Sequence, residues 1–338
     1  MNLFGRDLDR EVAVVAEIGV NHEGNVDAAS RILAAAAKAG ADAVKLQSYT
    51  PERYTSASDA ERFARVSRVA LDIAAHHRLA AEAKALGIPL LSTPLSEDWV
   101  PRIAEFAPAI KIASGDLTFE TVIRAAARTG KPVLLSTGCG VVDEIDRAVG
   151  WVRDEVGQKA LNERLVLLHC VSGYPTPIEQ ANVRAVSFLK TRYDLTVGYS
   201  NHVIGSEAVL AAVALGAAII EVHVTDADLR ETSSFRDHRL SFTGPELAAL
   251  IQSIRGVKSA LGDAAKTVQA AEAGNRDAIR KGIVAKHDLA AGVVLTDDDL
   301  LYARPATQFL AAERPTLIGR RLLRALRRGE IVPRDAVT

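Results

Sequence analysis

Short runs of apolar, often β-branched residues recur along the N-terminal two thirds of the chain, separated by longer alanine-rich segments. The runs are continuously apolar rather than alternating, which is typical of parallel strands covered on both faces. We expect eight strands, which begin near Val12, Ala41, Ile88, Ala109, Pro132, Leu165, Leu195 and Ala217. Their starts lie on average about 29 residues apart, the size of one strand–helix–strand unit.

The segments between these runs have the apolar period of a helix, and a glycine closes several of them. Gly40 follows one such segment, and Gly87, Gly130 and Gly216 stand at the same place before later strands. Glycine there indicates a left-handed helix cap. Eight such units predict a (β/α)8 TIM barrel. A doubly wound open sheet is the alternative, and it requires a reversal in strand order.

The pattern changes after about residue 262. Residues 263–280 carry few large apolar side chains, so we interpret them as a linker after a barrel domain of residues 1–262. Residues 281–338 show short apolar runs and Gly-containing turns without a long helical segment. This predicts a small β-rich domain, which is marginally stable by itself and is expected to pack against the barrel or a second subunit.

Composition narrows the class of protein. The 41 basic and 42 acidic residues nearly cancel, so no general attraction to nucleic acid or acidic lipid is expected. The two cysteines, Cys139 and Cys170, are too few for a disulfide scaffold, and we expect them to be buried rather than nucleophilic. The first residues lack the apolar core of a signal peptide. The longest apolar run, Ala208 to Ile220, is too short to span a bilayer. A cytoplasmic enzyme is expected.

Polar side chains stand at the C-terminal end of nearly every expected strand. They include Glu17, Lys45, Gln47, Thr93, Lys111, Ser114, Asp116, Ser136, Ser172, Tyr174, Ser200, His202, Glu221 and His223. A TIM barrel carries its active site at this rim. Because buried charges are costly unless they are paired, so many polar groups at one rim indicate a ligand site.

Two kinds of chemistry are suggested at the rim. His202 and His223 lie at adjacent strand ends and could bind a divalent metal, with Glu221 on the same side of its strand as His223. Lys45 and Lys111, together with nearby hydroxyls, suit a ligand that carries phosphate and carboxylate. The alternative interpretation is a set of internal salt bridges from these lysines to Glu17 and Asp116.

Taken together, the motifs of this rim resemble those of the sialic acid synthase family, the N-acetylneuraminate, legionaminate and pseudaminate synthases. AEIGVNHEGN, VKLQ, LLSTP, KIASGD, LSTG, HCVSGYPTP, VGYSNH and EVH occur in the family's order. The tail, from IVAKHDLAAG to LIGR, resembles the family's antifreeze-like (SAF) domain. The resemblance covers almost the whole chain.

The resemblance implies a role for each residue. His202 and His223 would bind the metal, Mn2+ or Mg2+. Phosphoenolpyruvate would contact Lys45, Gln47, Thr93, Lys111, Ser114, Ser172 and Ser200. Asp116 would be the catalytic carboxylate, and Tyr174, Asp237 and Arg304 the sugar contacts; for the proton transfer itself, Asp116 and Glu17 are the two alternatives. Because Arg304 belongs to the small domain, which in this family reaches into the partner's barrel, a domain-swapped homodimer is implied.

The implied reaction is a metal-dependent condensation of phosphoenolpyruvate with an amino-sugar aldehyde, N-acetylmannosamine or a 2,4-diacetamido relative, to a nonulosonic acid and phosphate. Three segments depart from the family pattern, and all lie where the sugar is expected: the loop after Lys45, the segment between His223 and Asp237, and ATQF after Pro305. One competing hypothesis is a Schiff-base aldolase or lyase that uses Lys45 or Lys111. Another is a non-catalytic sugar-binding protein.

Overall fold

The computed structural model describes residues 1–233 and 235–338, which form two compact units, Met1–Gly262 and Asp263–Thr338. In the first unit the described residues form eight parallel strands, β3 (Ala13–Gly19), β4 (Ala43–Ser48), β5 (Leu90–Pro94), β6 (Ile110–Ile112), β7 (Val133–Ser136), β8 (Leu165–Cys170), β9 (Thr196–Asn201) and β10 (Ile219–His223). They follow the order β5-β4-β3-β10-β9-β8-β7-β6, and β5 also contacts β6. The sheet is therefore a TIM barrel, as predicted, and the open-sheet alternative is wrong.

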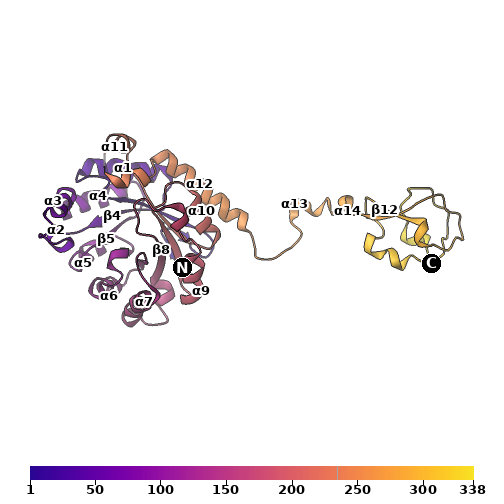
Figure 1. The fold of residues 1–338 in the computed structure, drawn as a ribbon, viewed down its shortest axis with the longest axis horizontal. Helices are drawn as coiled ribbons and strands as arrows, with labels where there is room; N and C mark the ends of the chain where they lie inside the picture. The colour runs from indigo at the N-terminus through magenta and orange to yellow at the C-terminus, as the bar shows by residue number, and fades with distance from the viewer. Residues whose placement is uncertain (234) are drawn as a thin grey trace. The chain divides into compact units, whose positions relative to one another are not determined.

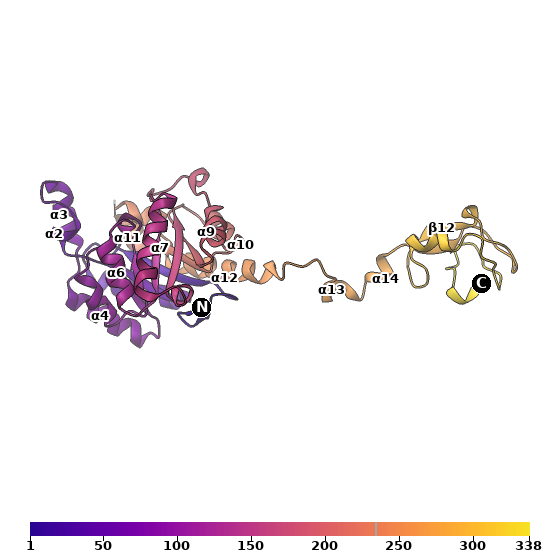
Figure 2. The ribbon, with the colours of Figure 1, turned by 90° about the horizontal axis from the view of Figure 1, so that it is seen from below.

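Helices surround these strands (Figure 1). Those of the first unit are α1 (Val26–Ala39), α2 (Pro51–Tyr54), α3 (Ala60–Val69), α4 (Ile73–Ala85), α5 (Trp99–Ala104), α6 (Glu120–Arg128), α7 (Val142–Val156), α8 (Leu161–Arg164), α9 (Ala185–Tyr193), α10 (Glu207–Ala214), α11 (Ala227–Thr232) and α12 (Gly244–Leu261). The short α2 and α3 lie together at the edge of the barrel, after β4 (Figure 2).

The predicted glycine caps are confirmed. Gly40 is the C-cap of α1 with φ 87°, and its amide donates to the carbonyls of Ala36 and Ala37. The other three glycines, Gly87, Gly130 and Gly216, also have positive φ. The apolar run from Ala208 to Ile220 is a buried helix, a turn and a buried strand, and no described helix is long and apolar enough to cross a membrane.

An N-terminal hairpin was not predicted. β1 (Asn2–Leu3) pairs with β2 (Arg6–Asp7). Leu3 of β1 and Leu8, which follows β2, pack in the barrel core. Two-residue strands carry no periodicity, so the sequence pattern gave no signal for them.

The second unit begins with exposed residues that include two short helical turns, α13 (Ala270–Ala273) and α14 (Arg276–Ile279). Beyond them, β11 (Gly282–Ala285) pairs antiparallel with β12 (Leu300–Ala303). Gly292, Gly319 and Gly329 have positive φ in its turns. A separate apolar core, which includes Ile283, Leu295 and Leu317, holds this unit together.

Candidate active site

A cavity of about 460 Å³ opens at the C-terminal ends of the strands. Each of the eight described barrel strands supplies at least one lining side chain. All fourteen residues named at the rim in the sequence line it: Glu17, Lys45, Gln47, Thr93, Lys111, Ser114, Asp116, Ser136, Ser172, Tyr174, Ser200, His202, Glu221 and His223. Because parallel strands all end at the same mouth of a closed barrel, residues far apart in sequence converge there.

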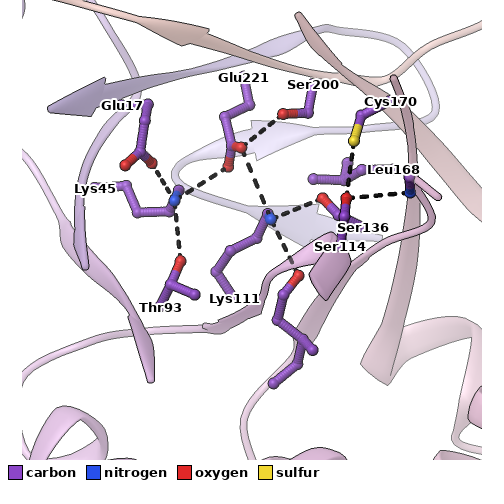
Figure 3. Close-up of polar contacts among 12 residues, drawn as sticks. Glu17, Lys45, Thr93, Lys111, Ser114, Ser136, Leu168, Cys170, Ser200 and Glu221 are labelled. Atoms are coloured by element: carbon purple, nitrogen blue, oxygen red, sulfur yellow. Dashed lines mark hydrogen bonds and ion pairs between the residues drawn. The ribbon is translucent and has the colours of Figure 1, made fainter. Parts of the chain in front are cut away.

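Glu221 lies at the centre of the charged groups, between two buried lysines (Figure 3). Its carboxylate oxygens lie 3.8 Å from Nζ of Lys45 and 3.8 Å from Nζ of Lys111, and the Ser200 hydroxyl donates to it at 2.8 Å. Burial alone would raise the pKa of Glu221, but Lys111, Lys45 and Ser200 outweigh burial and lower this pKa. Glu221 is therefore ionised and offsets part of the lysines' positive charge.

Lys45 also forms a close ion pair with Glu17 and donates to the Thr93 hydroxyl at 3.0 Å. Burial raises the pKa of Glu17, because loss of solvent together with repulsion from Glu221 outweighs attraction by Lys45. Of the two carboxylates that pair with Lys45, Glu17 is thus the one that exchanges a proton near neutral pH, whereas Glu221 stays ionised. Its ion pair with Lys45 confirms one of the internal salt bridges considered above.

Lys111 differs from the sequence interpretation. Its ion-pair partner is Glu221 rather than Asp116, and it donates to the Ser136 hydroxyl at 2.7 Å. Burial lowers the pKa of Lys111, although Glu221 opposes that shift. The Asp116 carboxyl lies in the same cavity, where burial raises its pKa to about 6, and its Oδ2 has no hydrogen-bond partner among the described residues.

The two histidines lie beside each other, with ring centroids 5.3 Å apart. His202 Nδ1 lies 2.7 Å from the carbonyl of Val171, which fixes the ring and leaves Nε2 for a ligand. His223 Nδ1 is buried without a hydrogen-bond partner among the described residues. Burial lowers the pKa of both rings, so they are neutral, the form that binds metals.

These two imidazoles fit a metal that keeps open positions for water or substrate. No cluster of three or more His, Cys, Asp or Glu side chains with metal-holding geometry occurs among the described residues. Glu221 lies on the same side of β10 as His223, as predicted, but its contacts are to Ser200 and the two lysines. Among the described residues, His202 and His223 are therefore the side chains that would hold a divalent ion here.

Hydroxyls and a backbone amide form the wall near β7 and β8. The Gly138 amide donates to Ser114 Oγ at 3.1 Å, and that oxygen lies 2.9 Å from Sγ of Cys170. Cys170 is buried as expected, whereas Cys139 is exposed and lines the cavity, which corrects the expectation that both thiols are buried. Cys139 has φ 59°, and this left-handed turn carries it out of the core.

A second cavity of about 900 Å³ adjoins the first. Gln47, Tyr174 and His223 line both cavities, and Asp237 lines the larger one. Tyr174 packs against the histidine pair, with its ring centroid 4.1 Å from that of His202 and 6.1 Å from that of His223. Of the predicted sugar residues, Tyr174 is thus a neighbour of both histidines, and Asp237 lines the same larger cavity as His223. Arg304 lies exposed in the other unit, so its sugar contact stays a prediction.

Sequence reasoning missed the contribution of α2 and α3. Arg53 and Arg62 line the smaller cavity, while Arg62, Arg65 and Arg68 line the larger one. Charged residues on a short helix usually face solvent, so the presence of arginines alone did not indicate that they line a cavity. Their spacing of three residues, which places 62, 65 and 68 on one face of a helix, is the pattern that would have indicated a shared wall.

The fold and this cavity define a TIM-barrel enzyme whose site is suited to an anionic ligand beside a divalent metal. Comparison with known proteins identifies the family to which this enzyme belongs. Residues 32–266 match the NeuB family and residues 280–338 match the SAF domain. The chain therefore belongs to the NeuB family, as a sialic acid synthase-like enzyme with a C-terminal SAF domain, and the resemblance seen in its motifs is confirmed.

Individual relatives span nearly the whole chain. It is 34% identical to N,N'-diacetyllegionaminic acid synthase of Campylobacter jejuni, over 96% of this chain and 99% of that protein. It is 31% identical to pseudaminic acid synthase of the same species, over 90% of this chain and 91% of that protein. The crystal structure of N-acetylneuraminic acid (sialic acid) synthetase from Leptospira borgpetersenii in complex with citrate is 32% identical, with a TM-score of 0.72 over 78% of this chain and 90% of that chain.

Proposed function

We propose that this enzyme condenses phosphoenolpyruvate with the open-chain aldehyde of an N-acylated amino sugar, giving a nonulosonic acid and phosphate. The observation that carries the proposal is a single cavity in which two buried lysines share one ionised carboxylate, with two neutral imidazoles beside them. An anionic ligand would bind to the two lysines and share them with Glu221 as a second source of negative charge. The names of the relatives support the same reaction class.

In this proposal, phosphoenolpyruvate occupies the smaller cavity. Lys45 and Lys111 bind its charged groups, and Gln47, Thr93, Ser114, Ser172 and Ser200 donate or accept hydrogen bonds around it. The sugar lies in the larger cavity against Tyr174 and Asp237. With both substrates held in adjoining cavities, C3 of the enol faces the aldehyde carbon, so orientation supplies much of the rate gain.

The bond changes follow from that arrangement. C3 attacks the aldehyde carbon, water adds to C2, and the tetrahedral centre breaks its C2–O bond to release phosphate. Glu17 and Asp116, whose pKa values are raised by burial, are the proton-transfer groups. A Mn2+ or Mg2+ ion at His202 and His223 would supply Lewis-acid polarisation of the aldehyde oxygen.

The experiment is phosphate release from phosphoenolpyruvate with N-acetylmannosamine and 2,4-diacetamido sugars as acceptors. We expect acceptor-dependent release that EDTA abolishes, and His202→Ala to remove metal-dependent turnover. His77→Ala, at an exposed position on α4, is the matched control and should keep full activity. An EDTA-resistant enzyme that His202→Ala leaves unchanged would refute the metal role.

The Schiff-base alternative predicts that a lysine reacts with pyruvate and that no phosphoenolpyruvate is consumed. Its nucleophile would need a lowered pKa, which Lys111 has and Lys45 lacks, since Glu17 and Glu221 outweigh burial and raise the pKa of Lys45. Borohydride trapping of pyruvate on Lys111, without consumption of phosphoenolpyruvate, would support that mechanism instead.

A further inference from the structure

Three polar side chains that contact one another in series, two of them buried, connect two segments that line the larger cavity. His238 Nε2 lies 3.0 Å from the Glu23 carboxylate, and His238 Nδ1 lies 2.6 Å from the Thr225 hydroxyl. His238 and Thr225 are each only 1% exposed. Glu23 lies after β3, and His238 lies in the 3-10 turn Arg236–Leu240 after β10, so the chain bridges positions 215 residues apart in the sequence.

The order carboxylate, imidazole, hydroxyl is that of a hydrolase triad, yet this hydroxyl is not available to a substrate. Thr225 is buried, lines neither cavity, and donates to the carbonyl of Asp226 at 3.2 Å. The carboxylate is the end that faces the cavity, because Glu23 is one of its lining residues. The Glu23–His238–Thr225 series therefore holds the cavity wall in place, and its hydroxyl is not a nucleophile.

The backbone on the Glu23 side is itself fixed. Glu23 and Gly24 both adopt positive φ, 49° and 83°. A Cβ at Gly24 would lie 2.4 Å from the carbonyl oxygen of Arg68, so the loop packs directly against the end of α3. The loop thus presents the Glu23 carboxylate to His238 in one orientation.

The backbone on the His238 side is tied to the same loop. The carbonyl of Asp237 accepts from the Ser241 hydroxyl at 2.6 Å, and Ser241 in turn accepts from Asn21 Nδ2 at 2.9 Å. Asp237, which lines the larger cavity, is therefore held between Asn21 on one side and the Glu23–His238 pair on the other.

We propose that His238 and Glu23 form a clasp that positions Asp237 toward the acceptor sugar, so that acceptor affinity depends on a histidine that touches neither substrate. The inference rests on the proposed function, in which the larger cavity holds the sugar. His238 is a positioning residue, since it lines neither cavity and acts through its neighbour Asp237. Loss of the clasp frees the segment 235–243 and lowers the fraction of enzyme ready to bind sugar.

The test compares KM for the acceptor with KM for phosphoenolpyruvate. Because hydrogen bonds to charged groups are the stronger ones, we expect His238→Ala to raise acceptor KM by about ten-fold or more, while KM for phosphoenolpyruvate stays within about two-fold. His238→Gln, whose amide can still donate to Glu23, should recover part of the affinity. Thr225→Val, a nearly isosteric change, should raise acceptor KM less than His238→Ala does.

His169→Gln is the matched control. His169 is also a buried histidine, bonded to the carbonyl of Ala181 at 2.9 Å, and it lines neither cavity. It should leave acceptor KM unchanged even if it lowers the melting temperature. The clasp is refuted if His238→Ala leaves acceptor KM unchanged, or if it raises both KM values equally.

A second readout separates this inference from the proposed function. A wild-type enzyme that releases no phosphate with any acceptor contradicts the proposed function alone. Hydrogen–deuterium exchange then decides the clasp: residues 235–243 should exchange faster in His238→Ala than in His238→Gln. Equal exchange in the two variants would overturn it.

Discussion

Glu221 is the residue that lets two lysines occupy one buried cavity. It accepts a hydrogen bond from Ser200 and lies within ion-pair distance of both ammonium groups. Two like charges without it would repel each other in surroundings of low dielectric. The sequence placed Glu221 on the correct side of its strand, beside His223, but did not predict its pairing with the two lysines, because the pairing partner of a buried charge is set by the barrel's closure and not by neighbours in sequence.

Asp116 contributes unfavourably to stability at neutral pH, since burial raises its pKa from 3.8 to about 6. A carboxyl with a raised folded-state pKa stabilises the fold below its unfolded pKa, and that contribution is lost as pH rises through about 6. We therefore expect Asp116→Asn to be more stable than wild type by about 2–3 kcal/mol at pH 8 and by less than about 1 kcal/mol at pH 4. Urea unfolding at the two pH values measures this difference.

The same variant should lose turnover, because an amide transfers no proton. Glu163→Gln, at an exposed position on α8, should change stability at neither pH. An Asp116→Asn enzyme that is stabilised equally at both pH values would show that the burial of the charge is not the cause.

Among the elements, the turn after β7 packs closely against three cavity-lining side chains at Gly138, which has no side chain of its own. A Cβ at Gly138 would lie 2.6 Å from Cys170 Sγ, 2.6 Å from Ser172 Oγ and 2.7 Å from Ser114 Oγ. Gly138→Ala should therefore displace these groups, costing about 1–3 kcal/mol by overpacking and raising KM for phosphoenolpyruvate. Thermal unfolding and steady-state kinetics measure the two effects.

Gly256→Ala is the matched change in a helix. It lies in α12, where a Cβ would meet nothing within 4 Å. It should leave kinetics unchanged and stabilise by about 0.5–1 kcal/mol, the usual gain for alanine over glycine in a helix. A Gly138→Ala enzyme that behaves like Gly256→Ala would contradict the close packing of the turn.

The elements differ in how far the sequence predicted them. All eight barrel strands were predicted, because each is a continuously apolar run closed by polar residues, and Gly40 and the other caps marked the preceding helices. The hairpin β1–β2 and the cavity-facing side of α3 were not predicted. The first is too short for a period, and the second has a charged face that only the tertiary fold turns toward a cavity.

At the scale of the whole molecule, the chain consists of two units, each with its own apolar core. The family resemblance predicts that Arg304 of one subunit completes the barrel site of its partner. Mixing a His202→Ala chain with an Arg304→Ala chain tests this. In a swapped dimer, one site of each mixed dimer combines an intact barrel with an intact small domain.

At an acceptor concentration at which neither variant turns over by itself, co-refolding the two chains should then restore about a quarter of wild-type activity, because about half of the dimers are mixed and one of their two sites is intact. Arg304→Ala alone should raise acceptor KM. A mixture no more active than the average of its parents would contradict the swap.

In the proposed reaction, this barrel joins C3 of phosphoenolpyruvate to a sugar aldehyde and releases phosphate by breaking the C2–O bond. The direct measurement uses phosphoenolpyruvate labelled with oxygen-18 at the bridging position, with an N-acylated amino sugar, and mass spectrometry of both products. We expect the label in phosphate and an acceptor-dependent nonulosonic acid without label. Label retained in pyruvate, with no new carbon–carbon bond, would contradict the account.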